Sequence, residues 1–314
     1  MLRQLERLKL GVPQKMRLIQ VAEYKQFLKE NLSVPVENVQ VKLVKDWKIQ
    51  CYQPAKFSRE EWTVWSFPER GDWATHIGDY RGNWSPYIPR NLIERYTKPG
   101  ELVCDPMAGS GTTLVECKLL GRNGIGVDIN PDAAMVTMNR LDFPCDRIGR
   151  DYNSPIIRVF AGDARNLDLL DNETVDLVAT HPPYAGIVSY SSARIQGDLS
   201  ALSITSFFDE IGLIARECFR VLKPQRYCAI LIGDTRKHRH YIPMHLGVLG
   251  KFLDAGFLLK EDVIKLQHKT KSSRETWNGR NYDFYKIAHE HLYIFRKPTS
   301  GENVDQYKHS MKWW

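Results

Sequence analysis

The sequence DPMAGSGTT at residues 105–113 follows the apolar run Leu102–Cys104 and decides the fold. The apolar run predicts a buried strand, and the glycines predict a tight loop that a ligand can approach closely, because glycine has no Cβ. A helix over Thr112–Leu120 is predicted to follow, closed by Gly121. A strand, a glycine loop and a helix in this order are typical of one half of a cofactor-binding α/β sheet.

Two further predicted strands end in acidic residues. Gly124–Val127 leads to Asp128, and Ile156–Phe160 leads to Gly162 and Asp163. Asp128 can accept the hydroxyl hydrogens of a ribose, or it can cap the helix that begins at residue 131. Asp163 and a neighbouring N–H group can read the edge of an adenine ring. The P-loop pattern is not present, which favours a cofactor without phosphates over ATP.

A second motif, HPPY at residues 181–184, follows the predicted strand Asp176–Thr180. Its position at the carboxyl end of a strand places it on the sheet edge where open α/β sheets bind ligands. The alternative is a histidine that merely ends a strand before a rigid Pro-Pro turn. Alternating strands and amphipathic helices continue from Thr205 to Phe295, which predicts a mostly parallel sheet covered on both faces.

With these two motifs the chain resembles S-adenosylmethionine-dependent amino-methyltransferases that modify adenine N6 or cytosine N4, over roughly residues 73–298. In that family the first motif is commonly D-P-F-x-G-S-G-T-T and the second [DNS]-P-P-[YFW]. This chain has Met107 and His181 at the two variable positions. The resemblance implies the α/β class I methyltransferase fold, a Rossmann-like, seven-stranded, mostly parallel sheet with one reversed strand. It also implies S-adenosyl-L-methionine as the cofactor.

The resemblance implies a catalytic role for His181, Pro182, Pro183 and Tyr184. A nucleobase amine is a poor nucleophile, and acceptors for both of its N–H groups would favour the pyramidal nitrogen of the transition state. By resemblance, His181 and the Pro182 carbonyl are those acceptors, and Tyr184 stacks on the flipped base. A neutral imidazole can accept one hydrogen bond and take up a proton. Methylation of cytosine carbon-5 needs a cysteine nucleophile, which this motif lacks.

The expected cofactor site draws on three parts of the chain. Upstream of the glycine loop, the cluster at residues 76–89 is dense in Gly, Pro and aromatic residues, and by resemblance it holds the amino-acid end of the cofactor. A Trp-rich packing loop is the alternative. The expected cofactor-binding residues are Asp79, Arg81, Asn83, Ser85, Asp105, Met107, Ala108, Gly109, Ser110, Gly111, Thr112, Asp128, Ile129, Asp163 and Ala164. No metal site is expected.

Basic residues mixed with aromatic ones predict contacts with nucleic acid in two places, residues 236–240 and residues 268–286. A solvated hairpin loop is the alternative. The expected nucleic-acid-binding residues are Arg236, His238, Lys269, Lys271, Arg274, Trp277 and Arg280.

Three segments are expected: a small α+β extension over residues 1–72, a methyltransferase domain over 73–298 and a polar tail over 299–314. Residues 1–60 contain twelve Lys and Arg against six Asp and Glu, a net charge of +6 out of +7 for the whole chain. This extension can be an electrostatic arm for nucleic acid or a packing element.

The composition agrees with an enzyme that acts on a polyanion, since the isoelectric point is about 9.0. No run approaches the roughly 20 apolar residues of a membrane span, and the six cysteines show no C-x-x-C spacing. These features predict a cytoplasmic protein, and the resemblance implies that it is an amino-methyltransferase acting on DNA. An RNA base N-methyltransferase and a non-catalytic cofactor-binding protein are the alternatives, and the target base and oligomeric state stay open.

Overall fold

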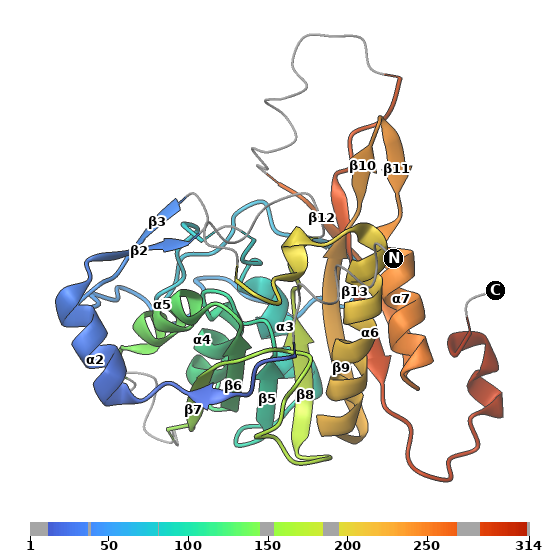
Figure 1. Cartoon of the computed structure of the whole chain (residues 1–314), viewed down its shortest axis with the longest axis horizontal. Coiled ribbons are helices and arrows are strands. Elements are labelled where there is room, and N and C mark those ends of the chain that lie inside the picture. Colours follow the sequence, from blue (N-terminus) through green and yellow to red (C-terminus); the bar gives the residue numbers. More distant parts are fainter. Residues whose placement is uncertain are drawn as a thin grey trace.

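The computed structural model describes residues 12–36, 39–80, 82–144, 154–184, 195–268 and 283–312. Within this part of the chain, the main sheet has nine strands in the order β1-β7-β6-β5-β8-β9-β13-β12-β4 (Figure 1). Its seven central strands are β5 (Leu102–Asp105), β6 (Asn123–Asp128), β7 (Ile157–Ala161), β8 (Val175–Thr180), β9 (Leu222–Gly233), β12 (Leu258–Leu266) and β13 (His289–Arg296).

The seven central strands confirm the expected methyltransferase sheet. They run parallel except for β13, which is antiparallel to both of its neighbours. The strand count needs correction, because two N-terminal strands extend the sheet from seven to nine in the described residues. β1 (Arg17–Leu18) pairs with β7, and β4 (Val64–Ser66) pairs with β12. Both additions cover edge strands, whose backbone groups would otherwise lack sheet partners.

Helices cover both faces of the sheet. α3 (Tyr87–Tyr96), α4 (Thr112–Leu119) and α5 (Pro131–Leu141) lie on one face, and α6 (Ile204–Val221) and α7 (Met244–Asp254) lie on the other (Figure 1). Successive residues of a strand point to opposite faces. Val103 accordingly packs in the cluster of α3, whereas Cys104 packs in the cluster of α6.

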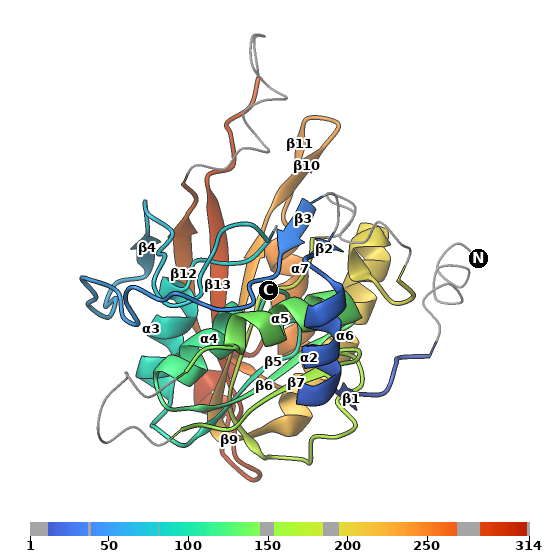
Figure 2. The same ribbon diagram turned by 90° about the vertical axis from the view of Figure 1, so that its left-hand side faces the viewer.

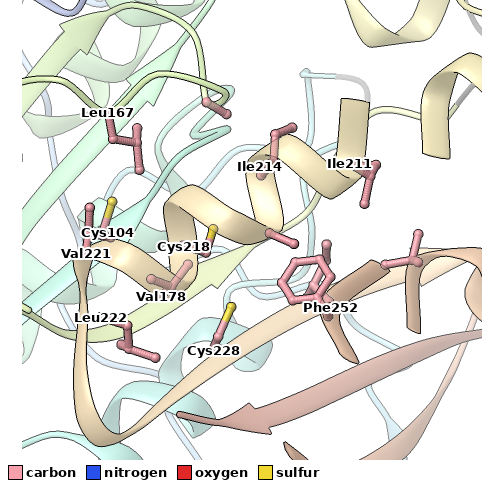
Figure 3. Packing of buried hydrophobic residues seen from close by; sticks show 14 of the residues in the cluster. Cys104, Leu167, Val178, Ile211, Ile214, Cys218, Val221, Leu222, Cys228 and Phe252 are labelled. Carbon is pink, nitrogen blue, oxygen red and sulfur yellow. The ribbon is translucent and has the colours of Figure 1, made fainter. Parts of the chain in front are cut away.

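The larger core lies between the sheet and helix α6. Figure 3 shows Cys218 of α6 among Cys104, Val178 and Cys228 from three adjacent strands, with Phe252 of α7 beside them. All five side chains are fully buried. The described cysteines in this core therefore act as small apolar residues. Burial raises the pKa of the Cys104 and Cys228 thiols, and also that of Cys117 on the opposite face of the sheet.

The N-terminal residues pack against the sheet and α5. α2 (Val21–Glu30), β2 (Ser33–Val36) and β3 (Val39–Lys42) lie beside α5 (Figure 2). Asn139 of α5 donates to the Tyr24 hydroxyl at 3.0 Å and to the Val44 carbonyl at 2.8 Å. The Trp47 indole donates to the Asn139 carbonyl at 2.8 Å. The described part of the expected extension thus shares its sheet and its core with the expected catalytic domain.

A two-stranded hairpin, β10 (Thr235–Lys237) and β11 (His240–Ile242), projects beyond the end of β9 (Figure 1). Its turn places His238 and Arg239 at φ of 50° and 69°. Two short 3₁₀ helices complete the structure, η1 (Leu199–Ala201) before α6 and η2 (Asp305–Ser310) in the tail. Among the described residues, no helix is both long and apolar enough to span a membrane.

Candidate active site

One large cavity lies at the carboxyl ends of β5 to β8. It contains about 940 Å³ of space, including the part open to solvent. Most of the predicted site residues meet there. Those that line the cavity are Asn83, Asp105, Met107, Ala108, Gly109, Ser110, Thr112, Asp128, Ile129, Asp163, Ala164, His181, Pro182 and Pro183.

Asp105 connects the glycine loop to its neighbours. It accepts hydrogen bonds from the hydroxyls of Thr113 at 2.5 Å and Thr180 at 2.8 Å, which lie on α4 and β8. Burial raises the pKa of Asp105 to about 6, although the hydrogen bonds from Thr113, Thr180 and the Met107 N–H act to lower it. The aspartate thus fixes the two motifs relative to each other.

The glycines of the loop allow close approaches. Gly111 precedes α4 with φ of 79°, and a Cβ there would lie 2.6 Å from Thr137 Cγ2 on α5. Gly111 does not line the cavity; it lets α4 and α5 approach. A Cβ on Gly109 would lie 3.2 Å from the ring of Tyr80, which also lines the cavity. Thr137 secures this arrangement by donating to the Gly109 carbonyl at 2.8 Å.

Asp128 lies at the end of β6 and accepts from the backbone N–H groups of Gly109 at 2.8 Å and Asn130 at 2.9 Å. Asn130 is the residue that caps α5, since its side chain accepts from Asp132 N–H at 3.0 Å. The capping role considered for Asp128 therefore belongs to Asn130. Burial raises the pKa of Asp128 to about 6, although its two backbone hydrogen bonds act to lower it.

Asp163 has a cationic partner that the sequence pattern did not indicate. Its carboxylate accepts from Arg165 Nη2 at 2.5 Å and Nε at 2.9 Å, and Arg165 Nη1 bonds Glu210 on α6 at 2.7 Å. All three side chains are buried. Asp163 therefore reaches the cavity already paired with a guanidinium, which it shares with Glu210.

Two residues expected at the amino-acid end of the cofactor make other contacts. Asp79 forms an ion pair with Arg140 on α5 at 2.6 Å. Ser85 donates to the Arg70 carbonyl at 2.7 Å. Neither lines the cavity, and both hold the loop in place through these contacts, so their cofactor contacts stay predictions. Asn83 does line it and donates to Ser110 Oγ at 3.3 Å, while Arg81 lies outside the described residues.

Glu116 of α4, fully buried, anchors the segment before α3. It accepts from the Trp73 indole at 2.7 Å and from Arg90 at 2.9 Å, and it bonds His76 Nε2 at 2.7 Å. Burial lowers the pKa of His76, although Glu116 acts to raise it. This anchor holds the loop that carries Trp84 over the cavity.

His181 directly follows β8, and β5 separates β8 from β6, the strand that ends at Asp128. Its ring stacks on Trp84 with centroids 6.0 Å apart and 22° between the planes. Burial lowers the pKa of His181, although Glu290 acts to raise it. The ring is therefore neutral at neutral pH and can accept a hydrogen bond. Trp84 belongs to the predicted upstream cluster, but its role was not foreseen.

Tyr184 differs from the stacking platform expected for it. It does not line the cavity, and its hydroxyl lies 2.9 Å from His181 Nε2 and donates to Glu290 Oε1 at 2.8 Å. A Cβ on Gly233 would lie 3.0 Å from this hydroxyl, so the glycine leaves room for the tyrosine. The stacking role stays a prediction.

A segment that sequence reasoning missed closes another side of the cavity. Ile195, Gly197, Asp198 and Leu199 line it, and Gly197 has φ of 98°. A Cβ on Gly197 would lie 2.6 Å from Ile129 and 3.2 Å from Asp163 Oδ2. The Gly-Asp pair before a helix was the available signal.

The basic hairpin residues have distinct environments. Arg236 donates to the Tyr285 carbonyl at 2.7 Å and lies over the Phe284 ring at 4.6 Å, so it fixes the hairpin to residues 284–285. His238 is exposed at the turn. Lys269, Lys271, Arg274, Trp277 and Arg280 lie outside the described residues.

Asp234, His289 and His291 offer coordinating atoms within 4.8 Å of one another. Asp234 Oδ1 already bonds His245 Nδ1 at 2.7 Å, and His291 Nδ1 bonds Asp262 at 3.1 Å. Two of the three side chains are thus already hydrogen-bonded to other residues, and we assign no metal to the group.

The strand order, the reversed β13 and a cavity built on the glycine loop together define a class I methyltransferase. The cavity residues fit S-adenosylmethionine, since the cavity is lined by acidic Asp128 and Asp163 together with apolar Met107, Ile129 and Leu199. The chain belongs to the N6_N4_Mtase family, described as DNA methylase, whose model matches residues 11–139 and 175–313.

Individual relatives match shorter stretches. The chain is 37% identical to the type II methyltransferase M.MjaII of Methanocaldococcus jannaschii over 65 residues, which are 21% of this chain and 12% of that protein. It is 34% identical to a tRNA (guanine(10)-N2)-dimethyltransferase of Methanothermobacter thermautotrophicus over 131 residues, 41% of this chain and 34% of that protein. The matches thus span about a third or less of these curated relatives.

Among solved structures, the fold is similar to a SAM-dependent methyltransferase from Methanosarcina mazei, with 15% identity and a TM-score of 0.46. The match covers 66% of this chain and 97% of that one.

Proposed function

We propose that the chain transfers a methyl group from S-adenosylmethionine to the exocyclic amine of cytosine (N4) or adenine (N6) in DNA, in the cytoplasm. The observation that carries the proposal is the single cavity, among the described residues, that both the glycine loop and His181-Pro182-Pro183 line. This geometry supports direct transfer, because a donor and an acceptor held in one site react without diffusing together.

Different residues of the cavity would contact different parts of the cofactor. Asp128 would accept hydrogen bonds from the ribose, and Asp163 with the Ala164 N–H would read the adenine edge. Asn83 would contact the amino-acid end. When bound, the cofactor supplies an electrophilic methyl group on sulfur.

His181 and Pro182 would act on the base. A ring nitrogen of neutral His181 and the Pro182 carbonyl would accept the two N–H groups of the amine and favour its pyramidal form. After transfer the nitrogen carries one proton too many, and the imidazole would receive it. The hairpin residue His238 and the basic residues between 269 and 280 would contact phosphates.

Transfer RNA is the second candidate substrate. It is favoured by the similarity to the tRNA dimethyltransferase, which extends over more of this chain than the similarity to M.MjaII does.

The test is methylation with isotopically labelled cofactor of duplex DNA and of tRNA in separate reactions, followed by mass spectrometry of the nucleosides. We expect N4-methylcytosine or N6-methyladenine from DNA. His181→Ala should lower the single-turnover rate by about 10²–10³ with cofactor affinity intact. Methylguanosine from tRNA together with unmodified DNA would refute the proposal.

A further inference from the structure

A chain of polar side chains runs from the antiparallel end of the sheet to His181. Lys265 on β12 donates to Glu290 Oε2 on β13 at 2.8 Å. Tyr184 donates to Glu290 Oε1 at 2.8 Å, and its oxygen lies 2.9 Å from His181 Nε2. Glu290 is 6% exposed, so water does not replace these contacts.

Counting protons along this chain assigns the tautomer of the imidazole. A carboxylate can only accept hydrogen bonds, and Lys265 can only donate. The single proton of the Tyr184 hydroxyl is therefore directed at Glu290. The Tyr184 oxygen must then accept from His181, which places the ring proton on Nε2. In a neutral ring the lone pair is left on Nδ1.

The remaining nitrogen is buried and has no hydrogen bond of good geometry in the described residues. The Gly82 backbone acts to raise the pKa of the ring, so it favours the imidazole once it has taken up a proton. Gly82, Trp84 and His181 all line the cavity. An unpaired buried acceptor is costly unless a ligand satisfies it.

We propose that Glu290, acting through Tyr184, is a positioning residue that holds His181 in the Nε2–H tautomer, so that Nδ1 accepts a hydrogen bond from the target amine. This inference rests on the proposed function for its last step, whereas the tautomer follows from the contacts of an ionised Glu290 with Tyr184 and Lys265. It also gives Tyr184 a polar role beside base stacking, because a stacking ring needs no hydroxyl.

The charges agree with this assignment. Burial favours a neutral Glu290, but the charge of Lys265 and the hydrogen bonds from Lys265 and Tyr184 lower the pKa of this carboxyl. Glu290 is therefore ionised at neutral pH. Burial keeps the imidazole neutral, although Glu290 raises its pKa.

Two variants separate this relay from packing. Tyr184→Phe keeps the aromatic ring but removes the hydroxyl that connects Glu290 to His181, which is the relay. Glu290→Gln reverses it, because the amide oxygen would face Lys265 and the amide NH₂ would face Tyr184, which turns the tyrosine proton toward His181. The matched controls are Tyr307→Phe and Glu302→Gln in the C-terminal tail, where Glu302 pairs with Arg296.

The readouts are ¹⁵N NMR of the His181 ring in the full chain and the single-turnover rate. We expect wild type and both controls to show the Nε2–H form. Both relay variants should lose it and react about 10²-fold more slowly with unchanged cofactor affinity. A wild-type spectrum in Glu290→Gln, or a wild-type rate in Tyr184→Phe, would overturn the proposal. If no nucleic acid is methylated, the proposed function fails, and the NMR result still decides the tautomer.

Discussion

At the scale of single residues, Asp128 serves both the loop and the cavity. One carboxylate oxygen accepts a hydrogen bond from the Gly109 N–H, and the other accepts one from the Asn130 N–H. The same side chain lines the cavity. The sequence alone left ribose binding and helix capping open. Because Asn130 takes the cap, ribose binding is the use that stays predicted for Asp128.

Asp128→Ala should weaken S-adenosylmethionine binding by about 1.5–3 kcal/mol, the usual value of a hydrogen bond to a charged group. Isothermal titration calorimetry on folded protein measures it. Asp132→Asn, in the first turn of α5 but outside the cavity, is the control and should bind normally. Unchanged affinity of Asp128→Ala would remove Asp128 from the cofactor site.

Asp105 provides a test of pH dependence. Its pKa rises from 3.8 to about 6 on burial, so the folded state binds more protons than the unfolded state between these values. Stability should therefore fall as pH rises through this window and level off above it. The contribution of Asp105 amounts to about 2 kcal/mol between pH values of about 4.5 and 7.

Asp105→Asn should remove that part of the pH dependence, because an amide does not titrate. Urea unfolding of the variant and wild type at both pH values checks it. Asp305→Asn, at an exposed residue of the tail, serves as the control, since it leaves Asp105 in place. Equal pH dependence in Asp105→Asn and wild type would show that burial does not raise this pKa in the folded protein.

At the scale of elements, the contact of α4 with α5 depends on one glycine. Gly111→Ala adds a Cβ 2.6 Å from Thr137 Cγ2 at a residue with φ of 79°. Overpacking of this kind costs about 1–3 kcal/mol, in addition to the backbone strain. The shift of Thr137 should also disturb Gly109 and lower cofactor affinity.

Gly100 provides the matched control, since it has φ of 83° but a Cβ added there would meet no atom within 4 Å among the described residues. Gly100→Ala should show the backbone strain alone, about 1–2 kcal/mol, with normal cofactor affinity. Urea unfolding and calorimetry compare the two variants. Equal destabilisation would mean that α5 moves away from α4 at no cost.

At the scale of the whole molecule, the N-terminal residues brace the sheet at both edges. Their strands β1 and β4 are the outermost strands of the described sheet, and Asn139 joins α5 to Tyr24 and Val44. The family match also continues across residue 72, the predicted boundary between the extension and the methyltransferase domain.

Asn139→Ala should destabilise the protein by about 2–4 kcal/mol, because it removes two hydrogen bonds to Val44 and one to Tyr24 and leaves buried groups unpaired. Urea unfolding gives the value, and limited proteolysis should cut first between residues 31 and 60. Asn303→Ala in the tail should stay within about 0.5 kcal/mol of wild type. Normal stability of Asn139→Ala would show that the N-terminal packing is dispensable.

The sequence by itself determined the seven central strands, the glycine loop and the carboxyl-end positions of Asp105, Asp128 and His181. These features depend on local periodicity and on the absence of a Cβ, both of which can be read within about ten residues. The resemblance carried by the two motifs predicted the family that the comparison confirms.

Only the tertiary structure decided which polar side chains face the cavity. Asp79 and Ser85 carry polar groups that could contact the cofactor, but they lie outside the cavity lining. Asp79 pairs with Arg140, and Ser85 donates to the Arg70 carbonyl. Glu290 lies 106 residues from Tyr184, and nothing local to it marks it as a partner. Hydrogen bonds between buried groups depend on distances of a few tenths of an ångström, which the packing of the strands sets and a linear pattern does not record.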